Sequence, residues 1–158
     1  GARGQPRPVS GDGSGVRTVG PMGVLAKRVA PAMSPRELLD AVRQLRFAGR
    51  YAAAARLLKQ LIAEFPNTRQ ALTAHVSLGQ LQLDHLRAPA AAYQSFSAYL
   101  RARPRGLLAP EAMWGQVLAS RGMGDRGQER TLLIQFIARF PNALQIRQAR
   151  RRLRQLTP

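Results

Sequence analysis

The sequence predicts an all-α fold: a right-handed α-solenoid of about three helical hairpins plus a C-terminal capping helix, preceded by a disordered N-terminal segment. After Ser34 the chain is rich in Ala, Leu, Gln and Arg, which are strong helix formers, and it shows no strict alternation of apolar and polar residues. Helix-stopping prolines recur at nearly constant spacing, because Pro66, Pro104 and Pro141 are 38 and 37 residues apart. Hairpins repeated at this period are typical of solenoids, whose units bury their apolar faces only against their neighbours.

The N-terminal segment, 1–33, is predicted to be a flexible Gly/Pro-rich lead-in or linker, and 34–158 to be the helical repeat domain. The first residues have no apolar period and are interrupted by Gly and Pro, so they cannot bury enough surface to become ordered. The chain begins with Gly1 rather than Met, which indicates a fragment, a processed chain or a tag remnant. This start is compatible with an upstream signal or membrane anchor that the sequence does not include.

A capping box opens the predicted repeat domain. Ser34 suits the N-cap, Pro35 suits the first helical position, and Glu37 completes the box. Gly49 is predicted to end this first helix and Pro66 the second, since proline cannot continue the hydrogen-bond ladder. The helices are expected at 35–48, 51–65, 69–84, 90–103, 110–121, 127–140 and 143–156.

The charge of the chain is strongly basic. It has 25 Lys+Arg against 8 Asp+Glu, a formal net charge of +17 at pH 7. All but two of the basic residues are Arg, which codon bias in a GC-rich genome would also explain, although such a bias does not explain the scarcity of acids. A charge of this size attracts acidic proteins, nucleic acid or anionic lipid surfaces, and it does not by itself choose among them.

The residues of the chain argue against catalysis. The absence of Cys excludes disulfides, thiolate zinc sites and cysteine nucleophiles. His75 and His85 are ten positions apart and therefore point to different faces of a helix, and neither has a carboxylate at a metal-pair spacing. The glycine-rich stretch 122–127 indicates a turn between helices. We therefore expect no enzyme activity, cofactor, metal or small-molecule substrate, and no stretch approaches the roughly 20 apolar residues of a membrane-spanning helix.

Two groups of residues resemble the tetratricopeptide repeat family. In the stretch 47–55, counting back from Pro66 as the terminal proline of a repeat places Gly49, Tyr51 and Ala54 at the family's expected offsets, and Leu58 follows the same pattern. The stretches 62–67 and 137–142 are near copies of each other. Two positions depart from the pattern, Arg87 where Gly is expected and Glu129 where a small Ala is usual.

The resemblance implies a non-catalytic protein–protein interaction scaffold. The long period and the Phe-Pro-Asn ending are similar to repeats of bacterial envelope proteins, including outer-membrane assembly lipoproteins and the periplasmic tails of anti-sigma regulators. The resemblance thus implies a bacterial envelope or regulatory assembly and a periplasmic or membrane-associated location.

The family's groove positions imply a first candidate site. Carried over onto the helices that begin at Pro35 and Pro110, these positions predict a partner-binding groove of Arg36, Leu39, Arg43, Arg46, Trp114, Leu118 and Arg121. Forked Arg donors would grip the carboxylates of an acidic protein segment, and the Trp would supply an apolar anchor. The alternative is ordinary packing between helices for Trp114 and a solvated face for the arginines.

The C-terminal helix supplies a second candidate site. Its apolar stripe can cap the solenoid, while a basic strip of Arg147, Arg150, Arg151, Arg152 and Arg154 would bind an acidic partner or a phosphate backbone. The alternative is the polar outer face that capping helices normally have.

Three functional hypotheses therefore remain open. The favoured partner is a protein with an acidic segment. The second hypothesis is non-specific binding of nucleic acid through phosphate contacts alone, and the third is a purely structural role as a spacer between other domains. The absence of aromatic residues from the C-terminal helix argues against recognition of single strands.

Overall fold

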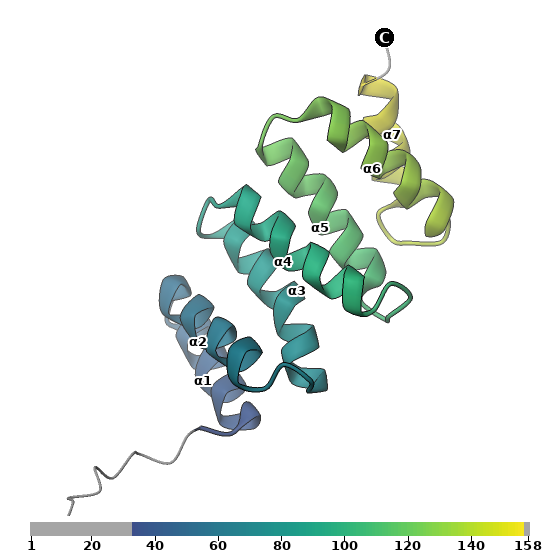
Figure 1. Ribbon diagram of the computed structural model, residues 1–158. Helices are drawn as coiled ribbons and strands as arrows, with labels where there is room; N and C mark the ends of the chain where they lie inside the picture. The colour runs from purple at the N-terminus through teal and green to yellow at the C-terminus, as the bar shows by residue number, and fades with distance from the viewer. Residues whose placement is uncertain (1–32, 157–158) are drawn as a thin grey trace, which may run out of the picture. The chain divides into compact units, whose positions relative to one another are not determined.

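The computed structural model describes residues 33–156, and within them the fold is all-α, as predicted (Figure 1). The predicted lead-in, 1–33, lies outside these residues apart from Met33. The described helices are α1 (Pro35–Phe47), α2 (Tyr51–Glu64), α3 (Arg69–Asp84), α4 (Pro89–Ala102), α5 (Ala109–Gly122), α6 (Arg126–Arg139) and α7 (Ile146–Leu156).

The predicted helix boundaries agree with the structure to within one residue, except at α7. The capping box of α1 is present: the side chain of Ser34 accepts a hydrogen bond from Glu37 N, and Ser34 N donates to the Glu37 carboxylate. This exchange holds the pKa of Glu37 below its usual value, because the hydrogen bonds favour the charged form. Helix α7 begins at Ile146 rather than at 143, because two tight turns precede it, with N–H groups donating three residues back at 3.0 Å.

Successive helices pack against each other as antiparallel hairpins and form a helical repeat solenoid with three apolar clusters. The first cluster joins α1, α2 and α3 around Leu38, Leu58 and Leu81. The second is centred on Phe96 of α4, and the third joins α5, α6 and α7 around Phe136 and Ala149. Each cluster takes residues from neighbouring hairpins, which is the packing expected when no hairpin can bury its own apolar face.

The turns inside the three hairpins share one backbone feature. Gly49, Arg87 and Gly124 all have positive φ, at 69°, 50° and 76°. Gly49 and Gly124 close Schellman motifs, in which the following residue donates to a carbonyl five positions back. Arg87 thus takes the left-handed conformation that glycine takes in the other two turns. Arg87 therefore differs from the family pattern in residue type, but the backbone conformation of the turn is the same.

None of the helices in residues 33–156 has both the length and the apolar character needed to cross a membrane.

Candidate functional site

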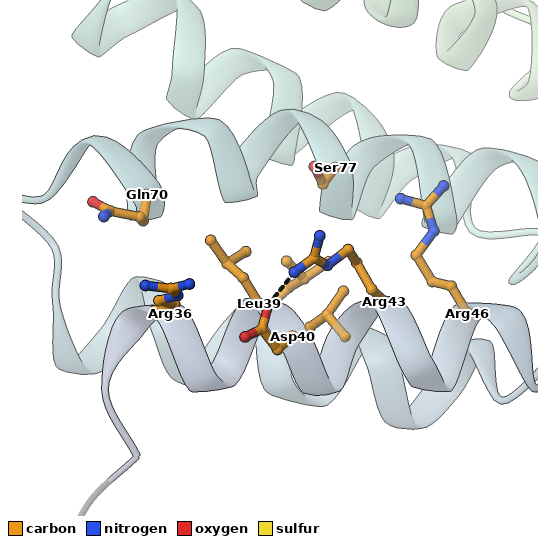
Figure 2. A pocket seen from close by; sticks show the side chains of 9 residues that line it. Arg36, Leu39, Asp40, Arg43, Arg46, Gln70 and Ser77 are labelled. Carbon is orange, nitrogen blue, oxygen red and sulfur yellow. Dashed lines mark hydrogen bonds and ion pairs between the residues drawn. The ribbon is translucent and has the colours of Figure 1, made fainter.

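A groove lies between α1 and α3 and has a volume of about 450 Å³ (Figure 2). We call it the α1–α3 groove; it is lined by Arg36, Leu39, Asp40, Val42, Arg43, Arg46, Leu58, Gln70 and Ser77. Figure 2 shows the side chains of α1 rising toward α3, with Arg36 near one end and Arg46 near the other. All four residues that were predicted from α1 (Arg36, Leu39, Arg43, Arg46) therefore line one hollow.

The groove is basic at its rim and apolar at its floor. Val42 and Leu58 are buried beneath it and Leu39 is half-buried. The Arg43 guanidinium forms an ion pair with Asp40, a residue of the same helix. Arg36 and Arg46 are exposed and form no ion pair with any described residue. The groove therefore offers two unneutralised guanidinium groups on either side of an apolar floor.

The residues predicted from α5 lie elsewhere. Trp114 and Leu118 line a second hollow of about 220 Å³, which we call the Trp114 pocket; its walls are Gln80, Leu83, Asp84, Phe96, Glu111, Trp114, Gly115, Leu118 and Gln145. Trp114 is half-buried, and its ring lies 5.5 Å from that of Phe136 between ring centroids. Arg121 is exposed near the end of α5 and lines neither hollow. The structure thus divides six of the predicted groove residues between two hollows with different charged residues and leaves Arg121 outside both.

Helices α3 and α5 pack closely beside the Trp114 pocket. The ring of Phe96 lies against Gly79 of α3 and Gly115 of α5, and a Cβ added at either glycine would come within 2.7 or 2.4 Å of ring carbons. One repeat earlier, 38 residues before each of these positions, the chain has Leu58, Ala41 and Ser77. Helix α3 contacts α5 directly, whereas α1 is joined to α3 mainly through α2, and the α1–α3 groove stays open between them.

The five arginines of the basic strip predicted on the C-terminal helix do not all share one environment. Arg147, Arg150, Arg151 and Arg154 are exposed. Arg152 instead reaches back to Glu129 of α6, where Nε donates to Oε1 at 2.7 Å and Nη2 to Oε2 at 2.9 Å. The hydrogen bonds that Arg152 donates to the Glu129 carboxylate raise the pKa of Arg152, because they favour its charged form. Arg152 is therefore a packing residue of α7 rather than a member of an open basic strip.

One member of this ion pair, Glu129, already departs from the repeat pattern in the sequence, but the sequence does not indicate its partner. Glu129 stands where the repeat pattern expects a small residue, and its side chain is 1% exposed. A buried carboxylate requires a partner, because burial without compensation is costly. The partner is 23 residues away in the sequence, a separation that the repeat pattern does not predict.

Neither histidine is placed for chemistry. His75 is half-buried on α3, and burial, with the nearby charge of Arg101, lowers its pKa. His85 caps the end of α3 and stacks on Tyr51 with ring centroids 3.6 Å apart. Within residues 33–156, no group of His, Asp and Glu side chains could hold a metal ion.

Residues 38–68 match the family model described as the tetratricopeptide repeat. This stretch covers most of the α1–α2 hairpin and the loop to α3, which is the hairpin that forms one wall of the α1–α3 groove. This stretch of the chain is therefore similar to a tetratricopeptide repeat (TPR). TPR repeats generally mediate protein–protein interactions and belong to a non-catalytic repeat family. No curated protein matches the chain.

Proposed function

We propose that this TPR-like chain is an interaction scaffold that binds an acidic, extended segment of a partner protein in the α1–α3 groove. The observation that carries the proposal is the pair of exposed, unpaired guanidinium groups of Arg36 and Arg46 above the apolar floor of Val42 and Leu58. Arginine forks suit carboxylates, and an apolar side chain of the segment would occupy the floor.

The groove also has polar side chains for the backbone of such a segment. Gln70 and Ser77 of α3 line the side opposite α1, and their side chains form no hydrogen bond with any described residue. An amide and a hydroxyl with free capacity can donate to and accept from an extended backbone. Main-chain hydrogen bonds of this kind would hold the segment whatever its sequence, while the arginines would select for acid.

The spacing of the arginines specifies the ligand further. Arg36 and Arg46 are ten positions apart on one helix, which corresponds to about 15 Å along its axis at about 1.5 Å per residue. An extended chain rises about 3.3 Å per residue, so two carboxylates four or five positions apart would reach both groups. An apolar residue between them would lie above Leu58.

A fluorescence-polarisation titration of the full chain tests the proposal. The probe is a fluorescein-labelled decapeptide with two Glu five positions apart and a Leu between them, and its control is the same peptide with Gln in place of Glu. We expect the Glu peptide to bind more tightly, and the paired substitutions Arg36→Gln and Arg46→Gln to remove most of the difference. Arg130→Gln on α6, which removes an equally exposed charge outside the groove, should change little.

The alternative function, non-specific binding of nucleic acid, rests on the four exposed arginines of α7. A labelled DNA duplex in the same titration separates it from the groove. If the duplex binds at physiological salt, and only substitution of these arginines abolishes its binding, the nucleic-acid function is favoured. Indifference of the Glu peptide to Arg36 and Arg46 would contradict the scaffold proposal.

We also propose that the partner belongs to a bacterial envelope or regulatory assembly, with the chain in the periplasm or at a membrane. The support for this setting is the similarity of the repeat period and of the Phe-Pro-Asn endings to envelope proteins. Fractionation of cells that express the full-length protein tests it, since recovery in the cytoplasmic fraction alone would exclude it.

A further inference from the structure

The Trp114 pocket has the opposite charge to the α1–α3 groove. Asp84, the last residue of α3, and Glu111, in the first turn of α5, both line it. Neither carboxylate forms an ion pair with a described residue, and no Lys or Arg is among the residues that line the pocket. On a chain of net charge +17 with 8 acids, two unneutralised carboxylates at one small hollow make a local reversal of charge.

Two further features favour a positive charge at this place. Asp84 lies at the C-terminal end of α3, where the negative end of a helix dipole stabilises cations, whereas Glu111 lies in the first turn of α5, where its carboxylate offsets the positive end of that helix. The face of a tryptophan ring attracts ammonium and guanidinium groups, and Trp114 is half-buried in the wall with Leu83 and Leu118 beside it. These apolar neighbours suit the methylene stem of a long basic side chain.

We propose that the Trp114 pocket binds a cationic side chain, an arginine or a lysine, of the partner protein. This deepens the proposed function and rests on it only in assuming that the partner is a protein. This proposal departs from the predicted role of Trp114 as an anchor for an acidic segment, because such a segment would meet the carboxylates of Asp84 and Glu111. The partner surface is therefore bipartite: acidic residues lie in the α1–α3 groove and a basic residue lies at Trp114.

Trp114 is the single tryptophan of the chain, so its emission reports on the pocket directly. The probes are the capped tripeptides acetyl-Gly-Arg-Gly-amide, acetyl-Gly-Glu-Gly-amide and acetyl-Gly-Leu-Gly-amide, titrated into the full chain. We expect a saturable emission change with the Arg probe alone, in the millimolar range of a single side-chain contact. Calorimetry with the Trp114→Phe variant checks that the ring contributes, since a weaker quadrupole should weaken the binding.

Charge variants decide the chemistry of the pocket. Asp84→Asn and Glu111→Gln keep the shape of each side chain and should each weaken the Arg probe roughly threefold, and together about tenfold. Glu64→Gln on α2 removes an exposed carboxylate far along the chain and should leave the binding unchanged. Circular dichroism of each variant confirms that the helices remain folded.

The outcomes separate this proposal from the groove proposal. An equal response to the Glu or Leu probe, no saturable response to the Arg probe, or indifference to Asp84→Asn with Glu111→Gln would overturn the cation site. The decapeptide titration with the Arg36 and Arg46 variants reports on the groove alone. Either proposal can therefore fail while the other stands.

Discussion

The α1–α3 groove and the Trp114 pocket lie at two successive junctions between hairpins, α1 with α3 and α3 with α5. The two hollows differ in volume and in the charge of the residues that line them. The groove is an open hollow of about 450 Å³ with arginines at its rim, whereas the pocket is about 220 Å³ and has carboxylates at its walls. At the later junction Phe96 packs between two glycines, where the earlier junction has Leu58, Ala41 and Ser77. Equivalent junctions of one repeat can thus present hollows with different packing and different charged residues.

The largest effect on stability should come from the ion pair between Arg152 of α7 and Glu129 of α6. Arg152→Ala leaves the carboxylate of Glu129 buried without a partner, and removing one member of such a pair is strongly destabilising. Urea denaturation should therefore show a strong loss of stability. Arg151→Ala, an exposed neighbour on the same helix, is the matched control and should have little effect.

The double variant Glu129→Leu with Arg152→Met sharpens this prediction. Replacing both charges with apolar side chains of similar size removes the unpaired carboxylate, so stability should return close to that of the parent chain. Failure of the double variant to recover would mean that the packing of α7, and not the charge pair, dominates.

A second prediction concerns the close packing beside the Trp114 pocket. Gly115→Ala places a Cβ about 2.4 Å from the Phe96 ring, and such overpacking generally costs about 1–3 kcal/mol, more than the roughly 1 kcal/mol that Ala gains over Gly in a helix. Thermal unfolding followed by circular dichroism should therefore show a lower midpoint for this variant than for the parent chain. Gly127→Ala in α6, whose added Cβ meets its nearest atom at 3.6 Å, should not destabilise.

The combination of Gly115→Ala with Phe96→Leu tests the comparison of the two junctions directly. It gives the pocket junction a leucine, as at Leu58, and removes the ring that an added Cβ would strike. The two substitutions should therefore be non-additive, with the double variant less destabilised than the sum of the single ones. Strict additivity would contradict the role assigned to Phe96.

A third prediction exchanges the charge of the groove alone. Arg46→Glu should weaken the acidic decapeptide by at least roughly tenfold, or about 1.4 kcal/mol, because a like charge replaces an attraction. The response of Trp114 to the arginine tripeptide should not change. If both signals weaken together, the two hollows are one site, and the division between them is wrong.

The smallest effect is expected at the turns that join the helices of each hairpin. Arg87→Gly should stabilise the chain by up to about 1 kcal/mol, because a non-glycine residue at positive φ is strained while glycine is not. Gly49→Ala should destabilise it by about the same amount, since the space is open but the backbone conformation is unfavourable. Equal stability of Arg87→Gly and the parent chain in thermal unfolding would show that the turn around Arg87 is not strained.

The local structure of the helices follows from residues that are close in the sequence. Ser34 and Glu37 set the start of α1, and Gly49 and Pro66 set the ends of α1 and α2, because caps and breakers act through neighbouring residues. The spacing of the prolines indicated the repeat, and the repeat placed four side chains of α1 along one groove. The left-handed conformation of Arg87 was not predicted, because the residue itself departs from the repeat pattern.

The contacts between hairpins, in contrast, depend on how the helices pack in three dimensions. The pairing of Glu129 with Arg152, the ring of Phe96 between Gly79 and Gly115, and the carboxylates beside Trp114 join residues from different helices. A one-dimensional pattern gives the face of a helix but neither the distance to the next helix nor the charges that the next helix contributes. For this reason the sequence predicted the fold and the basic groove, whereas the acidic pocket came from the packing.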